Sequence, residues 1–103
     1  MYFVYIIRCS GNSLYTGITT DISRRFAEHS SQGAKGAKFT RSHKALSVEA
    51  VWTADDRSSA SKLEYKLKTL THSQKEDLIA GKSDLTSLFA ITSGYARIAP
   101  PCP

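Results

Sequence analysis

The sequence predicts an α+β fold in which helices flank a small three-stranded antiparallel sheet. Residues 2–8 are almost all β-branched or aromatic, which is typical of a buried strand. Turn-forming residues at 10–13 separate this run from a second strand over 14–18, so we expect an antiparallel hairpin. Residues 46–53 alternate apolar and polar side chains, which predicts a third strand with one buried face.

Helical periodicity predicts two helices in the middle of the chain. Asp21 can cap a helix over about 22–30, in which Ile22 and Phe26 lie on one side. A second helix is expected over about 58–70. Its apolar stripe consists of Ala60, Leu63, Leu67 and Leu70.

Capping signals predict two shorter helices after these. Ser73 and Glu76 match a capping box, which would open a short helix that ends at Gly81. Asp84 can cap one further helical turn. The order of elements is therefore strand, strand, helix, strand and then helices, as in small α+β domains.

A chain of 103 residues has room for one domain, which excludes an enzyme with separate substrate and cofactor lobes. We expect a domain over residues 1–90 and a loosely ordered tail over 91–103. Apolar side chains become sparse beyond Thr92 and the chain ends Pro-Pro-Cys-Pro, which favours such a tail.

Cysteine content and hydropathy exclude several classes of protein. Cys9 and Cys102 are too few for a disulfide scaffold or a cysteine-based zinc site. The longest apolar run, residues 2–7, is too short to span a membrane. We therefore expect a reduced, cytoplasmic protein without membrane association, and no obligate protein partner is evident.

The charge of the chain is positive and unevenly distributed. Lys and Arg number 14 and Asp and Glu number 9, which gives a formal net charge of +5. Residues 1–50 carry 7 basic and 3 acidic groups, so most of the excess (7 − 3 = +4) lies in the first half. Such a balance favours a polyanionic partner such as nucleic acid.

One basic segment and one glycine are candidates for nucleic-acid binding. The predicted loop 33–44 combines basic groups with glycines and a phenylalanine and contains no acidic residue. Glycines let backbone amides approach phosphates, and an aromatic ring offers a stacking surface. Gly17 interrupts a predicted strand, which often marks a close approach by a backbone or ligand. The candidates are Gly17, Lys35, Lys38, Phe39, Arg41 and Lys44; a basic linker that only keeps the loop soluble explains the lysines and arginine equally well.

An ordered set of residues resembles a known family. The set begins with Val4-Tyr5-Ile6 and Tyr15-Thr16-Gly17 and continues with Arg25, His29 and Glu64. In this order and at these spacings it resembles the GIY-YIG nuclease domain over residues 2–82. The stretch 14–41 resembles the small stand-alone bacterial members of that superfamily, the YhbQ-like (UPF0213) group.

The resemblance implies a metal-dependent nuclease that hydrolyses phosphodiester bonds with low sequence specificity. The implied setting is DNA repair, recombination or nucleic-acid turnover, with DNA favoured over RNA. Glu64 matches the glutamate that binds one divalent metal, Mg²⁺ or Mn²⁺, and Arg25 matches the arginine that stabilises the scissile phosphate. Tyr5 matches the proposed general base, while Tyr15 and His29 match positions that orient groups or relay a proton.

The chain departs from the family pattern at three points. Val4 replaces the first glycine, Thr16 replaces the isoleucine of the second motif, and no asparagine follows Glu64 where many members carry one. A non-catalytic nucleic-acid-binding domain that keeps the fold is therefore the alternative function, and a protein-interaction module is a more remote one. The sequence leaves open whether the substrate is DNA or RNA, its structure and the pathway.

The shared site places a condition on the hairpin. If Tyr5 and Tyr15 line one site, they must project from the same face of the sheet. A two-residue loop, Gly11-Asn12, would put the two tyrosines on opposite faces. The catalytic interpretation therefore requires a loop of odd length or a bulge, with positive φ at Gly11 or Asn12.

Overall fold

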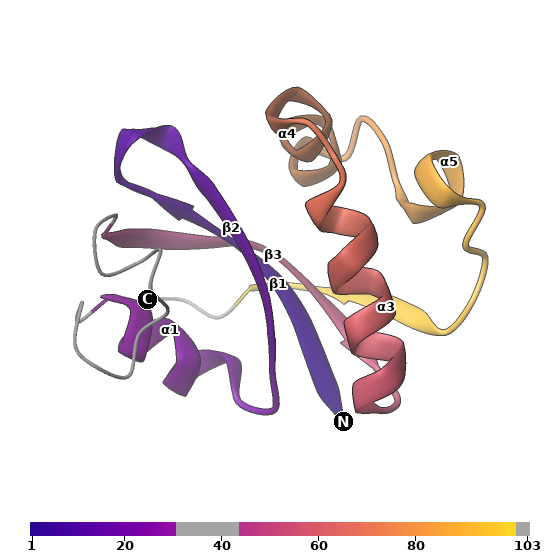
Figure 1. Ribbon diagram of the computed structural model, residues 1–103, viewed down its shortest axis with the longest axis horizontal. Helices are drawn as coiled ribbons and strands as arrows, with labels where there is room; N and C mark the ends of the chain where they lie inside the picture. Colours follow the sequence, from indigo (N-terminus) through magenta and orange to yellow (C-terminus); the bar gives the residue numbers. More distant parts are fainter. Residues whose placement is uncertain (31–43, 101–103) are drawn as a thin grey trace.

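Four antiparallel strands form one sheet in the order β2-β1-β3-β4 within residues 1–30 and 44–100, which the computed structural model of the chain describes (Figure 1). The strands are β1 (Tyr2–Cys9), β2 (Leu14–Thr19), β3 (Ala45–Ala54) and β4 (Tyr95–Ile98). The helices are α1 (Ile22–Ser30), α3 (Arg57–Lys68), α4 (His72–Ala80) and α5 (Leu85–Phe89), with a short 3₁₀ turn at Ser10–Asn12. None of these helices is both long and apolar enough to cross a membrane.

This architecture confirms the α+β class and corrects the predicted number of strands. The fourth strand, Tyr95–Ile98, lies where a loosely ordered tail over 91–103 was expected. It pairs with the end of β3, and the Tyr95 hydroxyl donates a hydrogen bond of 2.7 Å to the carbonyl of Ser59. Contacts with distant segments, rather than a local apolar run, therefore hold this short edge strand in place.

Helices cover both faces of the sheet (Figure 1). The face toward α3, here called the α3 face, buries Val4, Ile6 and Trp52 in one hydrophobic cluster. The opposite face, here called the α1 face, buries Tyr5 and Val51 in a second cluster to which α1 adds its apolar side. The prediction that only one face of the third strand is buried was wrong, because both faces carry a helix.

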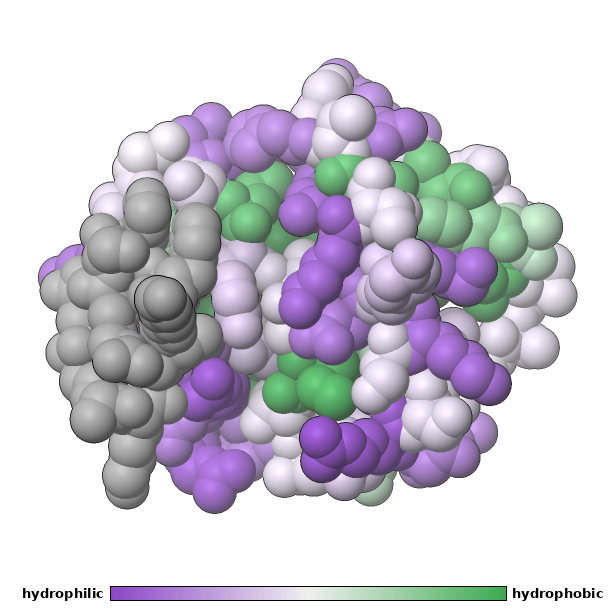
Figure 2. All heavy atoms as spheres, viewed as in Figure 1, coloured by the Kyte–Doolittle hydropathy of each residue, from purple (hydrophilic) through white to green (hydrophobic). Residues whose placement is uncertain are grey.

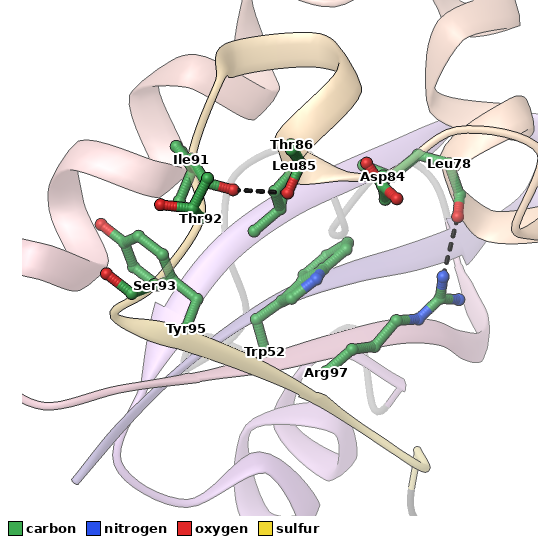
Figure 3. A pocket seen from close by; sticks show the side chains of 10 residues that line it. All are labelled: Trp52, Leu78, Asp84, Leu85, Thr86, Ile91, Thr92, Ser93, Tyr95 and Arg97. Carbon is green, nitrogen blue, oxygen red and sulfur yellow. Dashed lines mark hydrogen bonds between the residues drawn. The ribbon is translucent and has the colours of Figure 1, made fainter.

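Trp52 on the α3 face forms the floor of a small pocket between the sheet and α5. The pocket has a volume of about 210 Å³, and Leu85 and Tyr95 also line it. Figure 3 shows the Arg97 side chain beside Trp52, with its guanidinium directed at the carbonyl of Leu78. That hydrogen bond is 2.8 Å long, so β4 is tied to the end of α4 as well as to β3.

Two irregularities in β3 were not predicted. The register with β1 shifts so that Glu49 and Leu46 are skipped between paired residues, as in β-bulges. Each extra residue reverses the face on which the following side chains lie. Leu46, which the alternation placed on the buried face, is consequently 53% exposed.

The hairpin meets the condition set by the two tyrosines. Three residues, Ser10–Asn12, connect the strands, and the amide of Cys9 donates a hydrogen bond of 2.8 Å to the carbonyl of Ser13. Gly11 and Asn12 have φ angles of 76° and 64°, so both supply the positive φ that was expected. Tyr5 pairs with Gly17 and Tyr15 pairs with Ile7, so both tyrosines project from the α1 face.

Side-chain caps fix where the helices begin. The Asp21 carboxylate accepts a hydrogen bond of 3.1 Å from the amide of Arg24, as the predicted cap of α1 requires. The predicted capping box at Ser73 was wrong, because the residue that caps α4 lies two positions earlier, at Thr71. Thr71 and Gln74 form its capping box, with hydrogen bonds of 3.1 and 2.9 Å.

Glu76, which was predicted to belong to the capping box, hydrogen-bonds to Arg8 instead. Glu76 accepts two hydrogen bonds, of 2.9 and 2.6 Å, from the guanidinium of Arg8, which lies 68 residues earlier in the chain. The bond from Arg8 holds the pKa of the Glu76 carboxyl below its usual value. Nε of Arg8 donates a third bond, of 2.6 Å, to Glu49, the extra residue of the β3 bulge between Val48 and Ala50. Arg8 thus joins the hairpin, β3 and α4.

Candidate active site

Three aromatic side chains from separate elements form a cluster on the α1 face. Tyr5 comes from β1, Tyr15 from β2 and His29 from the end of α1. Their ring centroids are 6.4 Å apart for the two tyrosines, 6.0 Å for Tyr5 and His29, and 5.1 Å for Tyr15 and His29. The Tyr5 hydroxyl lies 3.0 Å from Nε2 of His29, within hydrogen-bonding distance.

Helical periodicity brings His29 to the two tyrosines. Ile22, Phe26 and His29 follow the i, i+4, i+7 spacing and therefore share one side of α1. Ile22 and Phe26 pack against the α1 face of the sheet, and His29 is fully buried at the end of the same stripe. The sequence pointed to a site role for His29 but not to this burial.

Burial sets the charge of both hydrogen-bonded groups. It lowers the pKa of His29 to about 4, and the nearby positive charge of Arg25 acts in the same direction. Burial raises the pKa of Tyr5 to about 12, although a hydrogen bond with Arg25 opposes this rise. At neutral pH the pair therefore consists of a neutral imidazole and a protonated phenol.

The neutral His29 should make the protein sensitive to acid. Its pKa in the folded protein, about 4, lies below the ordinary histidine value of 6.5, so the folded state binds the proton more weakly. The free energy of unfolding should therefore be unaffected by His29 above about pH 6.5. As the pH falls from there toward 4, it should decrease by up to about 3 kcal/mol, because the unfolded state takes up the proton first. Urea unfolding of the wild type and His29→Gln at several pH values measures this. Parallel pH profiles for the two proteins would contradict the prediction.

Gly17 leaves room for the Tyr5 ring. A Cβ atom at position 17 would lie 2.7 Å from Cζ of Tyr5 and closer still to its hydroxyl oxygen. Tyr5 and Gly17 are paired in the β1–β2 register, so the phenol lies across the edge strand β2. The predicted close approach at Gly17 is therefore made by a side chain of the same protein.

We expect Gly17→Ala to destabilise the protein by about 1–3 kcal/mol, because the new methyl group overpacks the site. It should also displace the Tyr5 hydroxyl from His29. Chemical denaturation measures the change in the free energy of unfolding. In a Tyr5→Leu background the same substitution should cost much less, and an equal cost in both backgrounds would show that the strain arises elsewhere.

Arg25 lies at the cluster and Arg24 does not. The Arg25 guanidinium hydrogen-bonds to the Tyr5 hydroxyl, and its Nη1 donates a bond of 2.9 Å to Glu28. Arg25 is half-buried, whereas Arg24 is exposed. The role of Glu28, three residues after Arg25, was not predicted, although the i, i+3 spacing of opposite charges could have revealed it.

Glu64 lies on the other side of the sheet from the cluster, and its charge affects the pKa of Tyr5. It lies on α3, and its carboxylate oxygen is 3.5 Å from Nζ of Lys68 in an i, i+4 ion pair. Its negative charge contributes to the raised pKa of Tyr5, so the two groups interact across β2. In Figure 1 the edge strand β2 lies in front, with α1 on one side and α3 on the other.

Comparison with known proteins identifies the family to which the chain belongs. The family model described as the GIY-YIG catalytic domain matches residues 1–77. The chain belongs to the GIY-YIG family. Its membership places the protein in a nuclease superfamily and confirms the resemblance noted in the sequence.

Individual relatives within the GIY-YIG family carry UPF0213 names. A UPF0213 protein of Vibrio cholerae is 51% identical over 90 residues, covering 84% of this chain and 85% of the relative. One of Cronobacter sakazakii is 51% identical over 81 residues, covering 79% and 83%. The solution NMR structure of a UPF0213 protein from Bacillus halodurans is 38% identical, with a TM-score of 0.48, and covers 80% of this chain and 86% of that one.

One departure from the GIY-YIG motif has a visible structural cost. Thr16 stands where the motif has isoleucine, and it is 2% exposed. It pairs with Ile6, which packs in the core of the α3 face. Among the described residues its hydroxyl has no hydrogen-bond partner, and burial of such a group costs about 1–3 kcal/mol.

Most of the predicted nucleic-acid contacts lie outside the described residues. These are Lys35, Lys38, Phe39 and Arg41. Lys44 is described and exposed just before β3, where its carbonyl accepts a hydrogen bond of 2.8 Å from the amide of Ser10. A role for these residues and for Gly17 in nucleic-acid binding stays a prediction.

Proposed function

We propose that the protein is a metal-dependent nuclease that hydrolyses phosphodiester bonds in nucleic acid, preferentially DNA, with low sequence specificity. The contact between the Tyr5 hydroxyl and His29 beside the Arg25 guanidinium carries this proposal. At the Tyr5 hydroxyl, a path for a proton toward His29 meets the guanidinium of Arg25, a group suited to binding phosphate. The negative charge of Glu64, on α3, makes a small contribution to the raised pKa of the same tyrosine, and this carboxylate is the group that would hold the metal.

The proton route runs from water through Tyr5 to His29. A phenol with a pKa of about 12 is a poor base in its protonated form, so it must give up its own proton as it accepts one. With the proton of His29 on Nδ1, Nε2 can accept the Tyr5 proton over 3.0 Å. The water oxygen then bonds to phosphorus, one of its protons passes to Tyr5, and the bond to the leaving oxygen breaks. The leaving oxygen takes a proton from solvent, and His29, whose pKa of about 4 strongly favours the neutral form, returns its proton through Tyr5 to solvent, so that both residues regain their starting states.

Arg25 is the group that stabilises the charge on phosphate. Its guanidinium carries five N–H donors and lies at the Tyr5 hydroxyl, where the attacking water would be activated. Guanidinium groups bind phosphate oxygens in a planar, bidentate manner. Contacts of this kind address the backbone of the nucleic acid and not the base edges, which accounts for the proposed low specificity.

The donor set fits a magnesium ion that keeps most of its water ligands. Among residues 1–30 and 44–100 no three acidic, histidine or cysteine side chains gather into a metal cluster. Mg²⁺ is commonly bound by one or two carboxylates together with water and substrate phosphate. Glu64 would hold it here once Lys68 is displaced, and Mn²⁺ could take the same place. The bound ion would supply charge neutralisation at the phosphate.

A non-catalytic nucleic-acid-binding domain is the second candidate function. The ion pair between Glu64 and Lys68 favours it, because it occupies the carboxylate that a metal would need. Plasmid nicking with Mg²⁺ or with EDTA separates the two functions. Nicking only with the metal supports the nuclease, whereas salt-sensitive DNA binding without any nicking in Mg²⁺ or Mn²⁺ supports the alternative.

The basic segment before β3 should contribute to affinity. We expect replacement of Lys35, Lys38, Arg41 and Lys44 by alanine to weaken binding to all DNA sequences. The slope of log K against log salt should fall by about 0.9 for each duplex phosphate that the variant no longer neutralises. Fluorescence anisotropy over a range of salt concentrations measures this slope. If the quadruple variant keeps the wild-type slope, these residues serve only solubility.

A further inference from the structure

A groove of about 560 Å³ runs along the outward side of α3, away from the sheet. Its lining includes the rings of Tyr65 and Phe89 and the side chains of Lys62 and Lys66. In Figure 2 hydrophilic residues over α3 border a hydrophobic area over α5, which contributes Phe89. The cluster of Tyr5 and His29 lies on the opposite face of the sheet, so this α3 groove is a separate surface.

The α3 groove follows the helix for most of its length. Its lining begins at Ser58 and ends at Thr69, and these eleven steps at 1.5 Å give a length of about 16 Å. Tyr65 lies near the middle and is 73% exposed, which is unusual for so large a ring. The side of α3 that faces the sheet is formed by other residues, among them Leu63 and Leu67.

Charge and hydrogen-bonding groups in the α3 groove suit a polyanion. The charged lining residues are both lysines, and no acidic residue among the described ones lines the groove. Nζ of Lys66 lies 5.6 Å from the centroid of the Phe89 ring, so the positive charge stands beside an aromatic surface. Ser58, Ser61 and Thr69 add hydroxyl groups of the kind that contact phosphates.

Aromatic rings interleaved with lysines identify the class of polyanion. An acidic peptide would satisfy the lysines but has no regular array of planar groups for the exposed ring. A nucleic-acid strand offers phosphates for lysines and bases that stack on aromatic rings. Bases in a duplex are stacked on one another and are not available, so the occupant must be single-stranded.

We propose that the α3 groove binds a single-stranded segment of nucleic acid, with a base stacked on Tyr65 and phosphates bound by Lys62 and Lys66. The connection to catalysis rests on the proposed function: Glu64 and Tyr65 are consecutive on α3 but point about 100° apart, so the bound strand would pass round the helix from one to the other. A strand that is cleaved next to Glu64 would continue along the groove. Substrates with a single-stranded arm beside the scissile bond would then bind more tightly than plain duplex.

Binding of a short labelled oligothymidylate, measured by fluorescence anisotropy in EDTA, tests the groove without cleavage. Tyr65→Ala should weaken this binding about tenfold, and Tyr65→Phe should stay within about twofold of wild type, because the ring is retained. Tyr65→Ala should leave the affinity for a blunt duplex unchanged. The double variant Lys62→Ala, Lys66→Ala should lower the salt slope by about 1.4, at about 0.7 for each phosphate of a single strand.

Lys82→Ala is the matched control, because Lys82 is an exposed lysine after α4 that does not line the groove. The proposal is overturned if Tyr65→Ala binds the oligonucleotide with wild-type affinity, or if Lys82→Ala changes the salt slope as much as the double lysine variant does.

A second copy of the chain is the other possible occupant of the groove. If sedimentation shows a dimer that Tyr65→Ala dissociates without loss of oligonucleotide binding, the proposal is also overturned. Binding that depends on Tyr65 in a protein that never cleaves refutes the proposed function alone. Cleavage that depends on Glu64 with unchanged binding by Tyr65→Ala refutes the groove alone.

Discussion

Replacement of Glu64 by glutamine is expected to reduce metal-dependent cleavage by about 10³-fold or more, while the fold is retained. Glutamine keeps the size of the side chain but removes the negative charge that would hold the metal. Loss of a metal that contributes several kcal/mol to the transition state corresponds to this factor. Plasmid nicking with saturating Mg²⁺ measures the effect.

Stability should change little in Glu64→Gln. The carboxylate is partly exposed and its pairing with Lys68, at 3.5 Å, is worth about 0.2–0.5 kcal/mol. Asp77→Asn, which removes a charge from α4, is the matched control and should cleave like wild type. Lys68→Met should bind metal at least as well as wild type, because the competing cation is gone. Wild-type cleavage by Glu64→Gln, or melting far below wild type, would exclude the metal role.

Arg25→Ala should lower turnover by about 10²–10³-fold, whereas Arg24→Ala should lower it by no more than about threefold. Removal of one preorganised group that stabilises transition-state charge has effects of the larger size. Neighbouring residues on a helix point about 100° apart, and of the two arginines Arg25 is the one that contacts the Tyr5 hydroxyl. Single-turnover cleavage with excess enzyme separates this effect from weaker binding.

Arg25→Lys provides the informative control for this pair. Lysine keeps the positive charge but cannot form the planar fork, so it should restore affinity more than turnover. Both alanine variants are expected to fold, since Arg25 is only half-buried and Arg24 is exposed. Equal losses from Arg24→Ala and Arg25→Ala would indicate general electrostatic binding and no role in the transition state.

Local patterns predicted most of the elements that build the site. The β-branched run predicted β1, the turn chemistry predicted the hairpin, and Asp21 predicted the start of α1. The parity argument also required an odd loop, and Ser10–Asn12 provides one. These features depend on interactions within a few residues, which is why the sequence alone was sufficient to predict them.

Features that depend on distant contacts could not be predicted in this way. The fourth strand is held by β3 and by Ser59, and its own residues show no strand pattern. The bulge at Glu49 places a carboxylate beside Arg8, which follows from pairing between strands and not from local sequence. The capping box was displaced because Thr71 offered an equivalent hydroxyl two residues before Ser73.

The candidate site itself was predicted by resemblance rather than by chemistry. Spacing alone allowed Tyr5 to be an ordinary strand aromatic and Glu64 to be an ordinary partner of Lys68, and the second pairing does exist. The neutral state of His29 could not be deduced, because it depends on burial beneath the sheet and on the charge of Arg25. These are properties of the assembled fold.

The hydrogen bonds between Arg8 and Glu76 bear on how far the protein can be truncated at its C-terminal end. The family match ends at residue 77, which suggests a place to truncate the chain to a minimal domain. Such a fragment would contain Glu76 but cut α4 in the middle, before Leu78 enters the core of the α3 face. Arg8, which lies next to the turn of the hairpin that carries both tyrosines, would then be bonded to a helix that is cut short. Because Arg97 of β4 also donates a hydrogen bond to the carbonyl of Leu78, we expect the smallest stable fragment to include both α4 and β4.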